Sequence, residues 1–421
     1  MSFSGQHRVV VTGVGLIDPF GDDTPFFSHL MRGDSATRLS RFSLQPPHEP
    51  FTQPTVQCRG FIPETMLGKA ISSMTDRYSQ LGIAAAFSAW QDAGFERGQS
   101  MPDNAGVSWG TGGGGVLTVD KGYSDFYERG KPRPSPLSVV FTMNNAAAAH
   151  IAIALGLGGA CLTHSVACAS SAISIGEAFR RIRSGEAPIM VAGGSEAPLS
   201  PAMMRAWEAM RVIAPAANED EAGCACRPFH SARSGFVLGE GGAALVLEER
   251  EHAVRRGARI YCELAGYGQS CDHTHIVRPD ANGQARAIRN ALHDASLHPE
   301  EIGYVNAHGT ATQEGDPVEI SALKTVFGEH ARRLPVSASK SMHGHLLGAA
   351  GAIEALVTVL ALSRQEIPPT AHLDDIAPAC TGVLHVTGEG IGDQRFDAAM
   401  SSSFAFGGSN AVLVFRRHHA S

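Results

Sequence analysis

Cys168 has the surroundings of a reactive thiol. It follows the short apolar segment 165–167 and precedes the segment 169–183, which is rich in small residues and has a helical period. A thiol at a helix N-terminus faces the positive end of the helix dipole and unpaired backbone N–H groups, which stabilise a thiolate and lower its pKa. A cysteine taken alone is more often a buried structural residue, so the case for chemistry depends on the residues that accompany it.

Two histidines stand where α/β proteins present side chains at the mouth of a sheet. His308 comes just after the strand-like run 304–306 and is followed by Gly309, and His345 precedes a second helical segment that is rich in small residues. Strand ends that are followed by glycine often carry functional side chains. A further segment, 404–410, places two consecutive glycines near the C-terminus. Together, the two histidines and the glycine-rich segment favour a nucleophilic role for Cys168 over a purely structural one.

Layered α/β elements must position these residues. Strand-like runs recur with helical periods between several of them, which is typical of an α/β protein. The helices after Cys168 and His345 look like counterparts, and the segments 191–197 and 404–411 each place a Gly-Gly turn at a strand edge. We therefore expect an internal duplication, in which residues 1–255 form a half that carries the cysteine and residues 256–421 form a half that carries the two histidines.

Composition narrows the class of protein. The chain has 421 residues, 43% of them hydrophobic and 18% charged, so it can bury a sizeable core and is too long for a small disulfide module. Its net charge of −7 and scattered arginine pairs give no nucleic-acid footprint. The eight cysteines have no framework spacing, and no signal or membrane segment is evident. We expect a cytoplasmic protein, in which the 47 glycines bring backbone segments close together.

The order of motifs resembles that of the β-ketoacyl-[acyl carrier protein] synthases of the thiolase superfamily, closest to the synthase II type. The resemblance runs over nearly the whole chain, from the first strand-like run to the last. The matching segments are 9–15, 191–194, 227–229, 235–241, 306–310, 340–351, 406–410 and 412–415. The family implies a five-layered αβαβα fold made of two similar α/β halves, and an acyltransferase that needs no cofactor.

The resemblance also implies a reaction. Cys168 would attack an acyl thioester and hold the acyl chain, and malonyl carrier protein would then lose CO2 to give the carbanion equivalent that attacks the Cys168 thioester. The backbone N–H groups of Cys168 and Phe406 would stabilise the tetrahedral intermediate. His308 and His345 would stabilise the enolate that decarboxylation forms. Lys340, held by Glu319 or Glu354, would orient and polarise the histidines.

Substrate and partner residues follow from the same resemblance. Thr310 and Thr312 would receive the pantetheine arm of an acyl carrier protein, and Gly113, Trp207 and Phe404 would line the acyl pocket. The family usually has a bulky aliphatic residue at the position of Gly113, so we expect a deeper pocket and a specialised fatty acid, polyene or polyketide pathway. Family members complete the acyl pocket at a subunit interface, which implies a homodimer or a heterodimer with a chain-length-factor-like subunit.

Carrier docking departs from the family pattern. The segment 68–77 has only Lys69 and Arg77 near its ends, where the family's docking helix is more basic. Docking would then rely on other cations, on a partner subunit or on an atypical carrier; the candidate cations are Lys131, Arg133, Arg205 and Arg211. The loop that contains Val277 also lacks the threonine that normally meets the pantetheine.

Other functions stay open at this point. His273 with His275, and His343 with His345, are histidine pairs that could bind zinc with a third ligand, and a metal assay would test this. The glycine clusters 13–15 and 110–115 are weak signals of a nucleotide site. Housekeeping fatty-acid elongation is the main alternative to a specialised pathway, and a noncatalytic partner subunit is disfavoured because the cysteine and both histidines are present.

Overall fold

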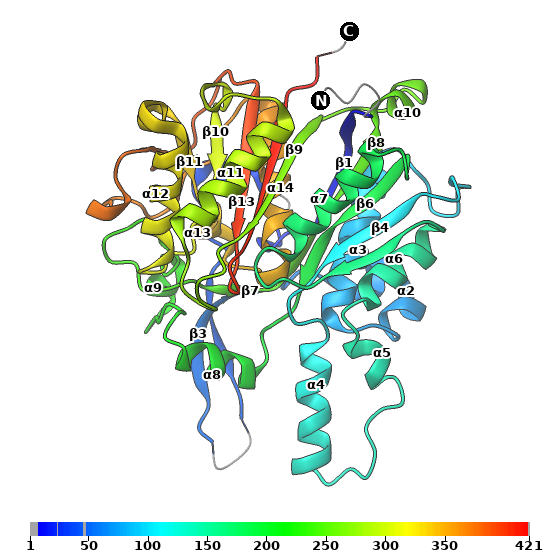
Figure 1. The fold of residues 1–421 in the computed structure, drawn as a ribbon. Helices are drawn as coiled ribbons and strands as arrows, with labels where there is room; N and C mark the ends of the chain where they lie inside the picture. Colours follow the sequence, from blue (N-terminus) through cyan, green and yellow to red (C-terminus); the bar gives the residue numbers. More distant parts are fainter. Residues whose placement is uncertain (1–6, 23, 45–47, 420–421) are drawn as a thin grey trace.

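Two halves with the same strand order build the main sheet (Figure 1). The computed structural model describes residues 7–22, 24–44 and 48–419. Within them, the first half has the order β5-β4-β6-β8-β1 and the second half β11-β10-β13-β14-β9. If the five strands of each half are numbered along the chain, both halves have the spatial order 3-2-4-5-1. In each half the first three strands of this order pair in parallel. The third and fourth strands pair antiparallel, and so do the fourth and fifth. The expected duplicated α/β fold is confirmed.

The strands of the two halves meet at the edge between β1 and β9, where three residue pairs connect them. A two-residue strand, β12 (Leu384–His385), extends the second half. The first half consists of β1 (Val9–Leu16), β4 (Gly106–Gly110), β5 (Cys161–His164), β6 (Ile189–Glu196) and β8 (Gly241–Glu249). The second half consists of β9 (Cys262–Cys271), β10 (Tyr304–Asn306), β11 (Pro335–Ser337), β13 (Ala398–Phe404) and β14 (Ser409–Arg416). A separate small sheet contains β2 (Arg38–Phe42), β3 (Phe51–Val56) and β7 (Leu238–Gly239).

Helices form the other three layers. The central layer is α7 (Ser170–Arg183) and α14 (Ala350–Arg364), which pack on each other and on strands of both halves. On the outer side of the first half, α3 (Arg77–Asp92) covers β1, β6 and β8. On the outer side of the second half, α11 (Ala281–Ala295) covers β9 and β14 and packs on α12 (Gly315–Phe327). The layers therefore alternate α, β, α, β, α, as the sequence predicts.

The remaining helices are short or lie at the periphery. The α-helices are α1 (Phe26–Arg32), α2 (Pro63–Ser72), α4 (Val116–Tyr123), α5 (Ser138–Thr142), α6 (Ala146–Leu155), α8 (Pro201–Ala209), α9 (Glu219–Gly223), α10 (Arg250–Arg255) and α13 (Lys340–His343). A π-helix, η1 (Ser124–Glu128), continues α4. Single-turn or short 3-10 segments are η2 (Pro299–Glu301), η3 (Gly328–Arg333), η4 (Leu347–Ala349) and η5 (Pro378–Cys380). Figure 1 shows α4 projecting away from the layered body.

Three hydrophobic clusters fill the spaces between the layers. The central cluster includes Ile175 and Phe179 of α7 and Ile353 and Leu356 of α14, so the helical faces expected after Cys168 and His345 do face the core. The outer clusters lie under α3 in the first half and under α11 and α12 in the second. One stretch, Leu347–Arg364, is long and apolar enough to cross a membrane, but 83% of it is buried inside the protein, as in the core helices of soluble proteins.

Glycines let the central helix α7 approach the strands closely. A Cβ atom on Gly110 of β4 would lie 2.4 Å from the backbone nitrogen of Ser171, and one on Gly194 of β6 would lie 2.6 Å from the Ser171 Cβ. Real Cβ atoms do not come this near, so larger residues would push the first turn of α7 away. The glycine-rich strands thus fix the position of the residues that precede this turn.

Candidate active site

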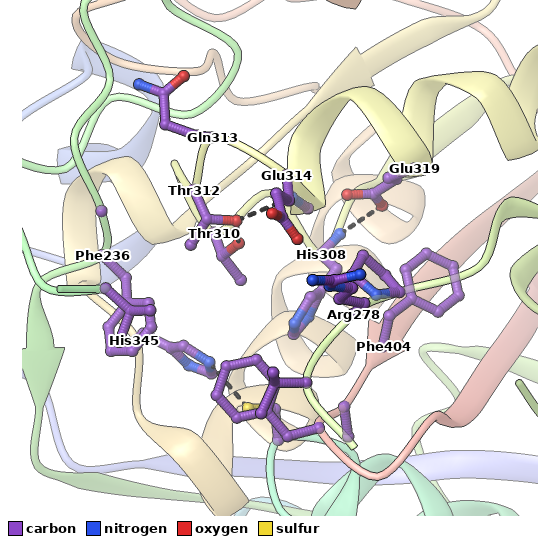
Figure 2. A pocket seen from close by; sticks show the side chains of 18 of the residues that line it. Phe236, Arg278, His308, Thr310, Thr312, Gln313, Glu314, Glu319, His345 and Phe404 are labelled. Carbon is purple, nitrogen blue, oxygen red and sulfur yellow. Dashed lines mark hydrogen bonds between the residues drawn. The ribbon is translucent and has the colours of Figure 1, made fainter. Parts of the chain in front are cut away.

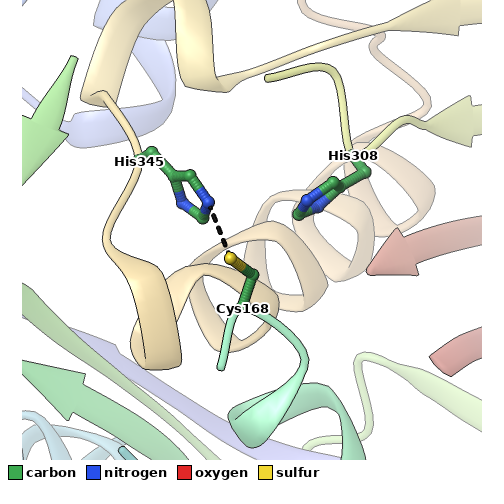
Figure 3. Close-up of side chains that lie close together, drawn as sticks. All are labelled: Cys168, His308 and His345. Carbon is green, nitrogen blue, oxygen red and sulfur yellow. Dashed lines mark hydrogen bonds between the residues drawn. The ribbon is translucent and has the colours of Figure 1, made fainter. Parts of the chain in front are cut away.

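Three elements that are far apart in sequence bring Cys168, His308 and His345 together (Figure 3). Cys168 precedes α7, His308 lies two residues after β10, and His345 stands between α13 and η4. The Cys168 Sγ lies 3.1 Å from the His345 Nε2, and one nitrogen of each imidazole and the sulfur all lie within 4.8 Å of one another. All three side chains are buried. The two central helices are also connected directly, because the Ala352 N–H donates to the Ser171 Oγ at 2.8 Å.

A tight turn holds Cys168 in front of α7. Ala167 has a φ of 48°, in the left-handed region that favours glycine. The Ser170 hydroxyl donates to the Ala167 carbonyl at 2.7 Å and accepts the Val166 N–H at 2.9 Å. Strained backbone of this kind persists where the surrounding structure determines it, often at functional sites. The turn aims the thiol at the histidines.

Hydrogen bonds to Nδ1 set the tautomer of the His308 and His345 imidazoles. The Leu347 N–H donates to the His345 Nδ1 at 3.2 Å, and Lys340 Nζ lies 3.2 Å from the His308 Nδ1 and 2.6 Å from its carbonyl oxygen. When Nδ1 of a neutral imidazole accepts a hydrogen bond, the proton resides on Nε2. Both rings therefore offer an Nε2–H donor, and that of His345 points at the Cys168 sulfur.

Buried charges behind the histidines hold this arrangement. Lys340 and Glu354 form a fully buried ion pair, and Glu354 rather than Glu319 contacts the lysine. Glu319 accepts the backbone N–H groups of His308 and Gly309 at 2.7 and 2.8 Å. The two carboxylates that sequence analysis could not tell apart thus act at different points, one on the Lys340 ammonium group and one on the backbone that carries His308.

Burial controls the protonation of the site. It lowers the pKa of His308 and of His345 well below the usual range, and the positive charge of Lys340 adds to this effect. Both imidazoles are therefore neutral. Burial also raises the pKa of Cys168 to about 12, and Lys340 offsets only part of the increase. The lowered cysteine pKa that the helix N-terminus alone predicts is wrong for the protein without substrate.

Two backbone N–H groups of residues that line one pocket, Cys168 and Phe406, are open to an oxyanion. Among the residues that the structure describes, neither the Cys168 N–H nor the Phe406 N–H donates to another residue. Phe406 lies in the turn between β13 and β14, where Gly407 and Gly408 both have positive φ angles. A pair of unpaired N–H donors beside a nucleophile is what a tetrahedral intermediate requires.

A pocket of about 370 Å³ leads to the thiol (Figure 2). Its lining includes the predicted site residues Cys168, Trp207, His308, Thr310, Thr312, Glu319, His345, Phe404 and Phe406. The hydroxyls of Thr310 and Thr312 lie 3.0 Å apart on one wall. The Trp207 ring stacks near Phe406, with ring centroids 6.4 Å apart, and the Phe404 ring meets His308 edge-on at 6.0 Å. The pocket can therefore hold an extended chain whose reactive end meets Cys168.

Gly113 lies outside the set of residues that line this pocket. It is exposed in the single chain, and a Cβ there would lie 2.7 Å from the Val116 Cγ2. Its backbone N–H donates to Glu196 Oε1 at 3.0 Å. The place of Gly113 in an acyl pocket stays a prediction.

Sequence reasoning missed the role of Glu196. This fully buried carboxylate accepts the N–H groups of Gly112, Gly113 and Gly348 at 2.6, 3.0 and 3.0 Å. It thereby connects the glycine-rich loop to η4, the turn that follows His345. An acidic residue at the end of the otherwise apolar run 189–196 was the available signal, because a charge in a buried strand needs several partners.

Three of the six cations considered for carrier docking are already paired. Arg77 donates to Glu240 at 2.7 Å, Lys131 to Asp125 at 2.9 Å, and Arg205 to Glu208 at 2.5 Å. Lys69 is exposed on α2, but Ile62 and Met66 beside it are exposed as well. Arg211, by contrast, lines the pocket.

The histidine pairs considered as zinc ligands do not converge. His273 and His275 lie on an exposed loop, where the His275 Nδ1 accepts the N–H groups of Val277 and Arg278. The His343 Nε2 bonds to the Ser339 hydroxyl, while His345 faces Cys168. In the part of the chain that the structure describes, the one group of three possible ligands is Cys168, His308 and His345. Their Nε2–H tautomers favour hydrogen bonding over metal coordination.

Comparisons with known proteins agree with this geometry. Residues 6–253 match the model of the β-ketoacyl synthase N-terminal domain, and residues 261–374 match that of its C-terminal domain. A 3-oxoacyl-[acyl-carrier-protein] synthase 2 of Coxiella burnetii is 37% identical over 98% of this chain and 99% of its own length. The corresponding synthase of Staphylococcus aureus strain COL is 37% identical over 99% of this chain and its full length.

Solved structures show the same fold. The ishigamide ketosynthase/chain length factor superimposes with a TM-score of 0.89 at 30% identity, over 98% of this chain and 100% of that one. A β-ketoacyl synthase from Burkholderia phymatum gives 0.88 at 34% identity over the same shares. A type II polyketide acyl-carrier protein in complex with its ketosynthase bound to the hexaketide gives 0.85 at 30% identity, again over 98% and 100%.

Proposed function

The chain belongs to the β-ketoacyl synthase family, and from that premise we propose that Cys168 carries the acyl group in its reaction. The reaction is a decarboxylative condensation of an acyl thioester with malonyl-[acyl carrier protein], which gives β-ketoacyl-[acyl carrier protein] and CO2. The observation that supports the assignment is the 3.1 Å contact between the Cys168 Sγ and the Nε2 of His345, with His308 beside them.

Acyl transfer to Cys168 is the first step. The sulfur attacks the carbonyl carbon of the acyl thioester, the new C–S bond forms, and the negative charge moves to the carbonyl oxygen. The Cys168 and Phe406 N–H groups stabilise this oxyanion. When it collapses, the bond to the carrier thiol breaks, and the proton of Cys168 leaves with the carrier as its free thiol. Because burial raises the pKa of Cys168, proton loss accompanies attack rather than preceding it.

Decarboxylation and condensation follow. The bond between C2 of the malonyl group and its carboxylate breaks, CO2 leaves, and the electron pair forms an enolate of the carrier thioester. The Nε2–H groups of His308 and His345 donate to the enolate oxygen. C2 then attacks the acyl carbonyl on Cys168, the C–S bond to the enzyme breaks, and the thiolate takes up a proton. Neutral imidazoles suit this step. Each donates a hydrogen bond from its Nε2–H to the enolate oxygen, and neither transfers a proton to the malonyl carboxylate.

Intact-mass analysis tests the assignment of the nucleophile. The purified protein incubated with an acyl-[acyl carrier protein] should gain the mass of one acyl group, and peptide mapping should place it on Cys168. The Cys168→Ala variant should gain none. An adduct on another cysteine of the wild-type protein would overturn the assignment.

We further propose a specialised rather than a housekeeping pathway. The aromatic wall that Trp207 and Phe406 form supports a long, unsaturated or aromatic-primed acyl chain. The proposal also requires that the acyl chain extends beyond the pocket described above to Gly113, which does not line that pocket. The Gly113→Ile variant should slow reaction with long or rigid acyl thioesters while sparing acetyl and butyryl groups. Equal effects on all chain lengths would show that Gly113 does not line the acyl pocket.

A second subunit fits the exposed surface of the first half. Large apolar side chains gather along α4, η1, α5 and α6, where Tyr127 is 76%, Val139 71% and Ile153 78% exposed. Strand β5 forms the adjacent edge of the main sheet. Apolar patches and open edges of this kind are usually covered. We propose a homodimer, or a heterodimer with a chain-length-factor-like subunit, with the glycine-rich loop near the interface.

The proposed carrier partner and location complete the function. An acyl carrier protein would deliver both acyl and malonyl groups through the pocket that Thr310 and Thr312 line. All eight cysteines are free thiols in the structure, which supports a reducing compartment such as the cytoplasm.

A further inference from the structure

Two unpaired cations lie at the pocket that leads to Cys168. Arg278 and Arg211 both line it, and both are exposed. Within the described ranges neither guanidinium group makes a hydrogen bond or ion pair. An exposed arginine that lines a pocket without a partner is free to bind an anion there.

Arg278 is the better placed of the two, because its loop is fixed. The Arg278 N–H and the Val277 N–H both donate to the His275 Nδ1. At the start of the loop, Asp272 accepts from the Asn410 side chain at 2.6 Å and from the Asp280 N–H at 3.0 Å. The Gly407 N–H also donates to the Ile276 carbonyl at 2.7 Å. The loop is thus attached to the turn that carries Phe406.

The same pocket carries the residues expected to receive the pantetheine arm. Thr310 and Thr312 stand there, and Glu314 follows them at the same pocket (Figure 2). Buried Cys168 and the two histidines lie at the inner end, whereas Arg278 is exposed to solvent. A chain that reaches Cys168 through this pocket would leave its outer end near Arg278.

We propose that Arg278 binds the phosphate group of the phosphopantetheine arm, an inference that rests on the proposed function. The arm has one thioester end and one phosphodiester end, and only the latter carries charge. A guanidinium group matches phosphate oxygens in geometry and charge. The carboxylate of Glu314 also lines the pocket and would repel the phosphate, and the positive charge of Arg278 would offset this repulsion.

The malonyl carboxylate is the other anion that could reach the pocket. It must lie at the thioester end, beside His308 and His345, because decarboxylation occurs there. The exposed position of Arg278 therefore favours the phosphate. An experiment can distinguish the two anions. The phosphate is present on acyl and malonyl donors alike, whereas the carboxylate is present only on the malonyl donor.

A binding measurement tests the assignment without catalysis. Phosphopantetheine and pantetheine differ only in the phosphate, and their dissociation constants can be measured by calorimetry for wild type and for Arg278→Gln. The variant should bind phosphopantetheine about tenfold more weakly and pantetheine within about twofold of wild type, the change expected when one charge-assisted contact is lost. Arg278→Lys should lose less affinity than Arg278→Gln.

Arg289→Gln is the matched control. Arg289 is exposed on α11, near the same loop in sequence, but it does not line the pocket. The control removes the same charge, so an equal loss of phosphopantetheine binding in both variants would show a general charge effect and overturn the assignment. Equal loss of both ligands in Arg278→Gln would also contradict it.

Kinetics with malonyl donors supply the second arm. If Arg278→Gln raised the KM of malonyl-pantetheine but left phosphopantetheine binding unchanged, Arg278 would contact the carboxylate and the phosphate assignment would be wrong. Failure of the wild-type protein to acylate Cys168 would instead refute the proposed function, while the difference between the two pantetheine ligands would still report on Arg278.

Discussion

Burial of Cys168 disfavours the thiolate form of its side chain. Because the pKa is raised to about 12, the thiolate fraction at neutral pH is small and grows with each unit of pH. We expect the rate of Cys168 alkylation by iodoacetamide to rise about tenfold per pH unit up to pH 9. Mass spectrometry of the Cys168 peptide measures this rate. A plateau below pH 8 would show that the helix N-terminus outweighs burial.

The two histidines should matter most for decarboxylation. Replacing His308 or His345 by Ala removes one Nε2–H donor to the enolate, which should slow malonyl decarboxylation about 100-fold, as loss of one oxyanion donor does elsewhere. Acyl transfer to Cys168 should stay measurable, since its oxyanion is held by backbone N–H groups. Release of CO2 and acylation of Cys168 are followed in parallel. Loss of both activities in folded variants would contradict this division of roles.

The Cys168→Gln variant should block acyl transfer and leave malonyl decarboxylation, the reverse of the effect expected for the histidine variants. It removes the acyl acceptor but leaves His308, His345 and Lys340 in place, so condensation should be abolished while malonyl decarboxylation continues or rises. CO2 release without β-ketoacyl product is the expected result. Loss of CO2 release in a folded variant would indicate that the thiol itself takes part in decarboxylation.

Sequence could predict that Cys168, His308 and His345 belong to one site because each stands in a local motif. Cys168, His308 and His345 all follow patterns that are readable within about ten residues. The contacts of Glu196 and the phosphate contact proposed for Arg278 were not predictable. Glu196 acts through N–H groups of Gly112 and Gly348, which are far from it in sequence. The role proposed for Arg278 depends on the pocket that the whole fold creates. The pKa of Cys168 was missed because burial, unlike a helix terminus, is a tertiary property.

At the scale of elements, the contact between α7 and β9 joins the two halves. A Cβ on Gly176 of α7 would lie 2.3 Å from ring atoms of Tyr267 on β9. Gly176→Ala should therefore lower the free energy of unfolding by about 1–3 kcal/mol through overpacking. Chemical denaturation measures this change. Gly122→Ala is the control, because a Cβ at this position of α4 meets nothing within 4 Å; it should be neutral or stabilising. A stable Gly176→Ala variant would contradict the close contact.

Sequence patterns predicted some elements better than others. The first and last strand-like runs, within residues 9–15 and 412–415, were visible as β-branched and aliphatic runs. Strand β13, with the sequence AAMSSSF, was not, since its small side chains have neither alternation nor high β-propensity. It is fully buried against α14, and the small residues allow that helix to pack closely. Close packing of layers thus hides strands from sequence analysis.

At the scale of the whole molecule, the exposed apolar residues of α4, η1, α5 and α6 predict a second subunit. Light scattering of the purified protein should give about twice the mass of 44.3 kDa, and Tyr127→Asp with Val139→Asp should shift the population towards monomer. A stable wild-type monomer that elongates acyl chains would defeat the dimer. A monomer that becomes active only with a homologous subunit would identify a heterodimer.

Reconstitution of the condensation tests the central claim most directly. The purified protein is given an acyl-[acyl carrier protein] and malonyl-[acyl carrier protein] labelled in its free carboxylate, and released CO2 and β-ketoacyl product are measured together. We expect the wild-type protein to release one labelled CO2 for each β-ketoacyl product that it forms. The Cys168→Ala variant should form no product. Product formation by Cys168→Ala, or a wild-type product that retains the label, would contradict it.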